Sequence, residues 1–243
     1  MTVWIGCPKT NFYADRHGLF PQAIVIHTLD DELAGGEAVI LDPTSRLSVH
    51  YAVSLAGDVF QYVHETDTAF HAGIVVNPSW KLLQNGVNPN FYTIGIALEG
   101  NATDPHPEVQ LSAAAALILE VVARWGIPLD GDHVIEHRAI RASKSCPGSG
   151  LDLGKLLAGI PRSSAAPPRA TATVRTVRNV NVRAGRPNTL APVERVLPAG
   201  SDVPVVGFTV GQRVEGNVYW YADAQGNYIW AGATNMPSPN PAA

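Results

Sequence analysis

The chain has few cysteines and no long apolar run. Only Cys7 and Cys146 occur in its 243 residues, which is too few for a disulfide-framed secreted domain and compatible with a reducing compartment. No stretch reaches the roughly 18 apolar residues of a membrane-spanning helix, so we expect no membrane insertion. The N-terminal sequence has no basic start followed by an apolar core and a small-residue cleavage site. We therefore expect synthesis in the cytoplasm without a signal peptide.

Lysine is absent after Lys155, and charge is unevenly distributed. Residues 1–161 carry 9 Lys and Arg against 17 Asp and Glu, a net charge of −8, whereas residues 162–243 carry 8 Arg against 4 Asp and Glu, a net charge of +4. A basic C-terminal part suggests contact with an anionic partner, such as a wall polymer, nucleic acid or a membrane surface. On charge alone, a solvated surface without a partner fits equally well.

A short segment rich in Pro, Ala and Ser divides the chain. RSSAAPPRATA, residues 162–172, lacks apolar periodicity and is typical of an interdomain linker. We predict an N-terminal domain over residues 1–161 and a C-terminal domain over residues 173–243.

The N-terminal part mixes apolar β-type runs with a long apolar helix. The predicted strands are residues 23–28, a hairpin over 50–63, and residues 92–100. A helix is predicted over residues 112–125, with Ser112 near its start and Gly126 and Pro128 ending it. This mixture predicts an α/β domain.

The C-terminal part alternates short β-type runs with Gly, Asn and Pro turns and has no helical period, which predicts a small all-β barrel. The NVRAG, LPAGSDVPVVG and GNYIWAG segments resemble bacterial SH3-like cell-wall modules over residues 173–234. The resemblance implies attachment to the cell wall, with an anionic wall polymer as a candidate ligand. We expect its aromatic side chains to be exposed: Tyr219, Trp220, Tyr221, Tyr228 and Trp230.

Two histidines and a cysteine are candidates for a metal site. His27 lies near the end of a predicted strand, His137 ends HVIEH, and Cys146 follows nine residues later. Zinc hydrolases use three ligands from His, Cys or carboxylate and keep a fourth position open for water. Taken singly, each of these residues is more often a structural histidine or a buried thiol. No HExxH or CxxC spacing fixes the geometry, so both interpretations stay open at this point.

Five separated motifs occur in the order VIHT, SVHYAV with GDVFQYV, FHAG, YTIGIALEG and HRAIRASKSCPG. With them, residues 4–161 resemble the zinc-dependent N-acetylmuramoyl-L-alanine amidases related to phage lysins and peptidoglycan recognition proteins. The resemblance implies a mixed central sheet flanked by helices, one Zn²⁺ per chain, and a groove for a glycan strand and its stem peptide. It implies bacterial peptidoglycan, and not nucleic acid, as the partner.

The resemblance also implies residue roles. His27, His137 and Cys146 match the metal ligands, and Lys144 matches the family's basic catalytic residue. His50 and His71 match groove residues that seat the substrate or support the metal ligands, although a structural role is nearly as common for such histidines. The remaining candidates, Cys7, His17, His64, His106 and His133, match no ligand position and are interpreted as structural.

Two positions depart from the family pattern. Some relatives place a catalytic Tyr immediately before the SVHYAV histidine, where this chain has Val49; strand alternation puts Tyr51 on the same side, as a candidate substitute that contacts substrate. Many relatives use a Glu directly after IGI as general base, where this chain has Ala97. Alternation puts Glu99 on the same side as Ala97, so Glu99 is either a substitute catalytic base or a structural carboxylate.

The implied activity is hydrolysis of the amide bond between N-acetylmuramic acid and L-alanine, by a bacteriolytic endolysin or autolysin that acts at the wall after release. A peptidoglycan-binding protein with weak or no catalysis is the alternative, and the missing Glu at Ala97 favours it. A cytosolic amidase acting on soluble muropeptides is a third reading, which the C-terminal module disfavours.

Overall fold

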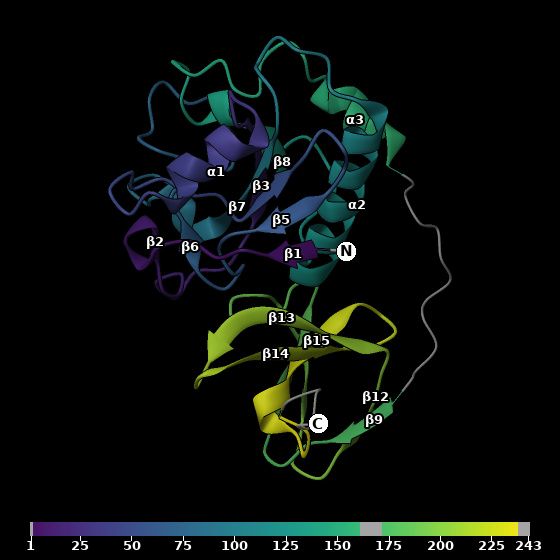
Figure 1. Ribbon diagram of the computed structural model, residues 1–243. Helices are drawn as coiled ribbons and strands as arrows, with labels where there is room; N and C mark the ends of the chain where they lie inside the picture. Colours follow the sequence, from purple (N-terminus) through teal and green to yellow (C-terminus); the bar gives the residue numbers. More distant parts are fainter. Residues whose placement is uncertain (1, 161–171, 238–243) are drawn as a thin grey trace. The chain divides into compact units, whose positions relative to one another are not determined.

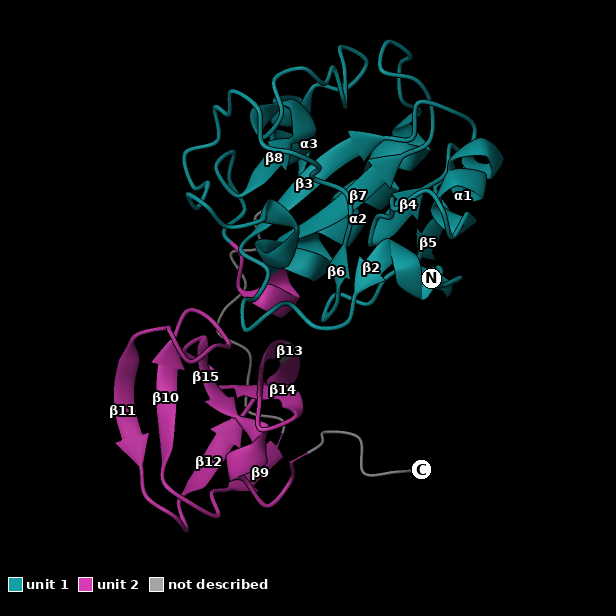
Figure 2. Cartoon of the chain, turned by 90° about the vertical axis from the view of Figure 1, so that its left-hand side faces the viewer, with its two compact units in different colours: residues 1–122, 128–161 teal, residues 123–127, 162–243 magenta. Residues whose placement is uncertain are grey.

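The computed structural model describes residues 2–160 and 172–237 (Figure 1). The chain divides into two compact units, residues 1–122 with 128–161 and residues 123–127 with 162–243, which Figure 2 colours separately. Except for its last residue, the predicted linker over 162–172 lies outside the described residues. In the described ranges, no helix combines the length and the apolar character needed to cross a membrane.

The first unit is built on a six-stranded mixed sheet with the order β1-β5-β4-β7-β3-β8. Strands β4, β7, β3 and β8 are parallel, and β5 returns antiparallel to β4 and pairs in parallel with β1. The mixed sheet and the hairpin are as predicted. The strands are β1 (Thr2–Trp4), β3 (Ala23–Thr28), β4 (Tyr51–Val53), β5 (Val59–Gln61), β7 (Thr93–Leu98) and β8 (Val134–Glu136); β2 (Phe12–Tyr13) and β6 (Thr68–Ala69) form a separate antiparallel pair.

The adjacent interior strands β3 and β7 are buried along their whole length. Both are rich in β-branched residues, and a parallel strand covered on both faces needs such a nearly continuous apolar run. In their register His27 is the partner of Ala97. Ala97 packs with Ala52 of β4 and Ile40 of the first helix, so these residues share one face of the sheet.

Helices flank this sheet: α1 (Leu33–Leu41), α2 (Glu108–Trp125) and α3 (Leu153–Gly159), with short 3-10 turns η1 (Lys9–Asn11), η2 (Pro89–Tyr92) and η3 (His137–Ala139). Helix α2 ends where predicted, because Gly126 adopts a positive φ of 63° that favours glycine. Its predicted start at Ser112 is wrong. The Pro107 carbonyl already accepts the Leu111 N–H at 3.0 Å, so the helix begins at Glu108 and Ser112 lies inside it.

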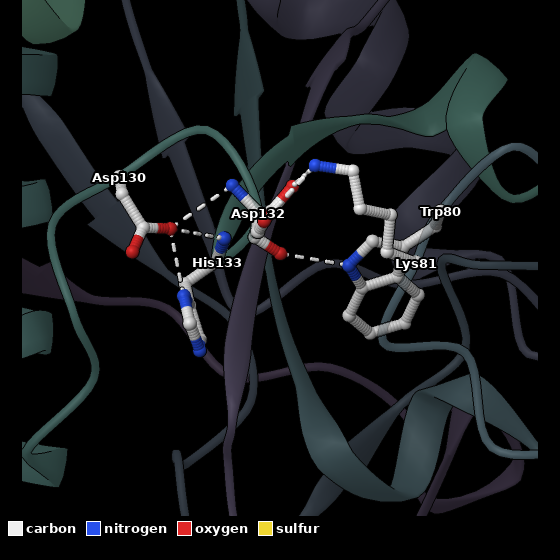
Figure 3. Close-up of polar contacts among 5 residues, drawn as sticks. All are labelled: Trp80, Lys81, Asp130, Asp132 and His133. Atoms are coloured by element: carbon white, nitrogen blue, oxygen red, sulfur yellow. Dashed lines mark hydrogen bonds and ion pairs between the residues drawn. The ribbon is translucent and has the colours of Figure 1, made fainter.

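Figure 3 shows the hydrogen-bonded loop that leads into β8. The Asp130 carboxylate accepts the backbone N–H groups of Asp132 and His133 at 2.9 and 3.0 Å, and its oxygen lies 2.7 Å from the His133 ring. Trp80 donates its indole N–H to the Asp132 carbonyl at 2.8 Å, and Lys81 pairs with the Asp132 carboxylate at 2.9 Å. Because β8 follows at once, this loop fixes the strand that leads to η3.

Residues 172–237 of the second unit form β-strands and one 3-10 turn, η4 (Ala231–Ala233). A five-stranded antiparallel sheet has the order β11-β10-β15-β14-β13, beside an antiparallel pair of β12 and β9. The strands are β9 (Ala172–Arg175), β10 (Val180–Ala184), β11 (Val193–Leu197), β12 (Asp202–Val205), β13 (Gly207–Val214), β14 (Asn217–Ala222) and β15 (Asn227–Trp230).

The expectation that the five aromatic residues of this unit are exposed is wrong: Tyr219 and Tyr228 are half-buried and pack against the core, and the other three are buried. Trp220, Tyr221 and Trp230 are only 2, 4 and 8% exposed and form its core with Val182 and Ile229. A unit this small has few large side chains with which to build a core, so its aromatic residues are used for packing.

Candidate metal centre

His27, His137 and Cys146 lie together at the C-terminal ends of two adjacent strands. Because β3 and β8 are parallel neighbours, His27 near the end of β3 meets His137 at the start of η3, with ring centroids 4.5 Å apart. The loop after η3 adds Cys146. The three potential ligand atoms lie within 4.8 Å of one another, and all three residues are buried. They form the one such His, Cys, Asp or Glu cluster within residues 2–160 and 172–237.

Hydrogen bonds assign the ring nitrogen that His27 offers to a metal. Thr93 donates its hydroxyl to the Pro89 carbonyl at 2.8 Å, so its oxygen accepts the N–H from His71 Nε2, 3.2 Å away. His71 Nδ1 is then an acceptor for the N–H at His27 Nε2, at 3.1 Å. The proton on Nε2 leaves the lone pair of His27 Nδ1 free for a metal.

His137 is oriented in the same way. Its Nε2 lies 3.0 Å from the Ala72 carbonyl, which only accepts hydrogen bonds, so Nε2 carries the proton and Nδ1 the lone pair. Burial lowers the pKa of both His27 and His137, which keeps the rings in the neutral form that metal ligation requires.

Cys146 completes the set of donors. Its sulfur accepts the Thr28 N–H at 3.1 Å, and burial raises the pKa of the thiol above its ordinary value. A cation next to the sulfur reverses this effect and holds the thiolate. Two neutral imidazoles and a buried thiol, each with a hydrogen bond that sets its orientation, therefore fit a bound metal ion.

A cavity of about 410 Å³ opens above this cluster. Lys144, two residues before Cys146, is exposed and lines it, as do His71 and Ala97. Residues of α1 and of the loops before β4 and after β6 form the apolar side: Val39, Ile40, Leu47, Val49 and Phe70. The structure thus brings together the three predicted ligands, Lys144 and His71.

His71 is held against β7 by contacts that sequence reasoning missed. A Cβ atom at Gly95 would lie 2.5 Å from the His71 ring, so only glycine at that position lets the ring approach the strand. The Asn90 side chain accepts the backbone N–H groups of His71 and Ala72 at 3.1 and 2.8 Å. The glycine in the IGI motif was the available signal.

His50 and Tyr51 lie outside the cavity. They are 0 and 4% exposed. His50 Nδ1 accepts the Gly95 N–H at 3.0 Å, and Nε2 lies 2.7 Å from the Arg16 guanidinium. Tyr51 donates its hydroxyl to Glu65 at 2.7 Å. This placement argues against the predicted contact of either residue with substrate.

Val49 and Tyr51 do not share a face, contrary to the expectation from strand alternation. Val49 lines the cavity and packs in the cluster that contains Ala52 and Ala97. Residues 48–50 precede β4, which begins at Tyr51, so the two-residue period does not extend back to Val49.

The Glu99 carboxylate is bound by two backbone N–H groups. One carboxylate oxygen accepts the Leu33 N–H at the start of α1, at 2.9 Å, and the other accepts the Leu55 N–H of the β4–β5 turn, at 2.7 Å. Ala97 lines the cavity, whereas Glu99 is not among its lining residues. This placement argues against Glu99 as a substitute base.

A buried arginine that contacts His50 was also not predicted from the sequence. Arg16 is 3% exposed, and burial lowers its pKa to about 9, so it remains charged at neutral pH. It lies in a loop without apolar periodicity, so no sequence pattern marks it. Its guanidinium donates to four backbone carbonyls in addition to its contact with His50: those of Glu65, Asn90, Phe91 and Thr93.

Known amidases resemble about half of the chain. It is 30% identical over 128 residues to N-acetylmuramoyl-L-alanine amidase A of Achromobacter lyticus, a match that covers 51% of this chain and 63% of that protein. It is 29% identical over 119 residues to the 1,6-anhydro-N-acetylmuramyl-L-alanine amidase AmpD of Enterobacter cloacae, covering 49% of this chain and 59% of that protein. The matches span about three fifths of the length of these relatives.

Solved structures share the fold of the first unit. A selenomethionine derivative of AmpD superposes with a TM-score of 0.54 at 23% identity, covering 66% of this chain and 94% of that one. A mutant endolysin from Bacillus subtilis gives a TM-score of 0.52 at 21% identity, covering 66% and 99%. The N-acetylmuramoyl-L-alanine amidase family model matches residues 17–149, more than half of the chain and the whole of the cluster described above. The chain therefore belongs to the N-acetylmuramoyl-L-alanine amidase family.

Proposed function

We propose that this chain hydrolyses the amide bond between N-acetylmuramic acid and L-alanine in bacterial peptidoglycan, with one zinc ion held by His27, His137 and Cys146. The observation that carries the proposal is this buried cluster at the base of a cavity that Lys144 also lines. Two imidazoles and a thiolate are a donor set that suits zinc, and three protein ligands leave a fourth position for water.

The residues around the ligands support this chemistry. A bound zinc ion supplies a Lewis acid and lowers the pKa of its water toward about 7. His71 and the Ala72 carbonyl hold the two ligand rings in the required orientation. Lys144, an ammonium group at the cavity wall, would hydrogen-bond the amide oxygen as negative charge develops on it.

The least complete part of this site is the general base, the group that accepts a proton during hydrolysis. Ala97 offers none, and the Glu99 carboxylate is already bound by two backbone N–H groups. Two carboxylates do line the cavity, Asp30 and Asp31, and Asp30 accepts the Thr28 hydroxyl at 2.9 Å. We propose that no carboxylate has fully replaced the missing one and that the amidase is slow.

Binding of peptidoglycan with weak or no catalysis is the second candidate, and the alanine at position 97 favours it. Both candidates are tested by incubating the zinc-loaded protein with purified walls and measuring new L-alanine amino termini and new glycan reducing ends. The amidase produces amino termini without reducing ends. Wall binding with no amino termini after prolonged incubation would establish the second candidate.

The substrate is proposed to be the wall itself rather than soluble muropeptides, although four relatives are named 1,6-anhydro-N-acetylmuramyl-L-alanine amidase. We propose that residues 1–161 form the amidase domain, residues 162–172 a linker, and residues 173–243 an SH3-like wall-binding domain. The all-antiparallel second unit supports this assignment. Comparing hydrolysis of walls with that of a soluble anhydro-muropeptide tests it, and a preference for the soluble substrate would contradict a role as wall lysin.

A further inference from the structure

The second unit contains a groove of about 250 Å³ with a mixed polar and apolar lining. Trp230 and Trp220 contribute the apolar part, and the rim carries charged and amide side chains. Arg183 comes from β10, Arg178 from the segment before it, and Glu215 from the β13–β14 turn. All lining residues belong to the second unit.

Arg178 and Glu215 form a fixed pair on the rim. The Arg178 guanidinium lies 4.8 Å from the centre of the Trp230 ring and pairs with one Glu215 carboxylate oxygen at 2.6 Å. Stacking and ion pairing together restrict the arginine, so the groove presents an ordered cation and an ordered carboxylate before any ligand binds. Such pre-organisation reduces the entropy lost on binding.

Arg183 provides the second charge. It is partly buried, and burial lowers its pKa. One nitrogen donates to the Ala191 carbonyl at 2.7 Å, but no carboxylate within residues 172–237 forms an ion pair with it. It also lies at an irregularity in the pairing of β10 with β11, and such bulges re-aim side chains out of the regular pleat. A partly desolvated guanidinium without a counter-charge favours an anionic ligand.

The charge pattern decides which anion fits. A phosphodiester polymer would find one unpaired cation for its repeated negative charges, because Arg178 is already paired with Glu215, and a neutral glycan would leave Arg183 without a partner. A short peptide that carries both a carboxylate and a free amine complements Arg183 and Glu215, and its backbone amides complement Asn181 and Thr189 on the same groove. Stem peptides of peptidoglycan carry these groups.

We propose that this groove binds the stem peptide of peptidoglycan, with a peptide carboxylate on Arg183 and a peptide amine near Glu215. The assignment rests on the proposed wall-binding role of the second unit. Under this proposal both units recognise the peptide. The cavity of the first unit takes the scissile amide, and the groove of the second unit retains the protein on the wall.

The test uses the full chain without metal, so that walls stay intact, and measures sedimentation with walls stripped of phosphodiester polymer. Arg183→Gln is expected to weaken binding roughly tenfold or more, the effect of losing a hydrogen bond between charged groups. Arg175→Gln is the matched control, because it removes the same charge from an exposed pair with Asp202 outside the groove. It is expected to bind as the wild type does.

Competition identifies the ligand. A free tetrapeptide stem is expected to displace the wild type from walls, and polyglycerol phosphate at equal charge concentration is not. Glu215→Gln, at an exposed turn, is expected to weaken competition by an N-terminally acetylated tetrapeptide with a free side-chain amine and not by a form in which that amine is acetylated as well, because the terminal amine of the stem is bonded to the glycan in intact walls. If Arg183→Gln melts early, Arg183→Lys, which keeps the charge, replaces it and is expected to bind more weakly than the wild type.

Three results would overturn the proposal: equal binding of Arg183→Gln and wild type, equal weakening by Arg183→Gln and Arg175→Gln, or binding lost when the phosphodiester polymer is removed. The proposed amidase activity is tested in a separate experiment, with zinc-loaded protein and a soluble muropeptide. Arg183→Gln and wild type are expected to release L-alanine amino termini from it at the same rate.

Discussion

His27 and Ala97 are register partners on the adjacent parallel strands β3 and β7, and both line the cavity. A longer side chain at position 97 would therefore enter the cavity beside His27, a proposed metal ligand. Glu99, two residues on, has its carboxylate bound to Leu33 and Leu55 instead.

This relationship predicts that Ala97→Glu raises the rate of amide hydrolysis. A positioned general base contributes roughly 10² to 10⁴ in rate, so single-turnover hydrolysis at saturating zinc should rise by a large factor. Glu99→Gln should retain most of the wild-type rate and lose about 1 to 3 kcal/mol of stability, because the amide has one acceptor oxygen and leaves the N–H of either Leu33 or Leu55 without its acceptor.

Asp30→Asn serves as the control for a base already present in the cavity. An unchanged or lower rate for Ala97→Glu, together with a severe loss for Glu99→Gln or Asp30→Asn, would show that another carboxylate has taken over.

Lys144 is expected to act on the rate and not on the metal. Lys144→Met should reduce kcat by about 10² to 10³, the usual effect of removing one donor to a developing oxyanion, while zinc content stays at the wild-type level. Lys155→Met is the matched control, since Lys155 is exposed on α3 and lies outside the cavity. Equal activity of the two variants would remove Lys144 from the mechanism.

Arg16 is expected to be a large contributor to stability. Arg16→Met removes the donors of four backbone carbonyls and a buried charge, which should lower the free energy of unfolding by about 3 to 5 kcal/mol. The exposed Arg46 provides the comparison, because Arg46→Met should stay within about 0.5 kcal/mol of the wild type. Urea unfolding measures both, and similar midpoints would contradict the buried placement of Arg16.

The Cys7 thiol should react slowly with alkylating reagents at neutral pH. Burial raises the pKa of its thiol to about 11, and the thiolate is the reactive form. The rate of alkylation by iodoacetamide should therefore rise about tenfold per pH unit above pH 8 and level off only near pH 11, whereas a free cysteine levels off near its ordinary pKa of about 8.5. Mass spectrometry of the peptide containing Cys7 follows this rate, and a plateau by pH 9 would contradict the burial.

The sequence predicted those parts of the fold that local patterns determine. The run over residues 23–28 is β3 with the same bounds, and the apolar helix ends at Trp125 as its Gly and Pro signals indicated. The start of that helix was misplaced because Ser112 resembles a capping residue, whereas Pro107 already provides the first carbonyl acceptor.

The site was less predictable because it depends on contacts between distant segments. Motif order named the three residues that the structure brings together as the candidate metal site, but the predicted roles of Tyr51 and Glu99 depended on how far strand alternation extends. Alternation fails before β4, and beyond β7 it does not specify what a side chain binds: Glu99 meets two backbone N–H groups that lie 66 and 44 residues away in sequence. The aromatic residues of the second unit were misjudged because composition does not distinguish a binding surface from the core of a small domain.

Zinc titration of the metal-free protein tests the central claim most directly. The release of L-alanine amino termini from purified walls should rise linearly with added zinc and level off at about one zinc per chain, because three ligands form one site. Cys146→Ser should fail to bind zinc at equimolar concentration and should have no activity, since a hydroxyl does not supply the charge of a thiolate. Full zinc content and full activity in Cys146→Ser, or hydrolysis by the wild type that a chelator leaves unchanged, would contradict the account.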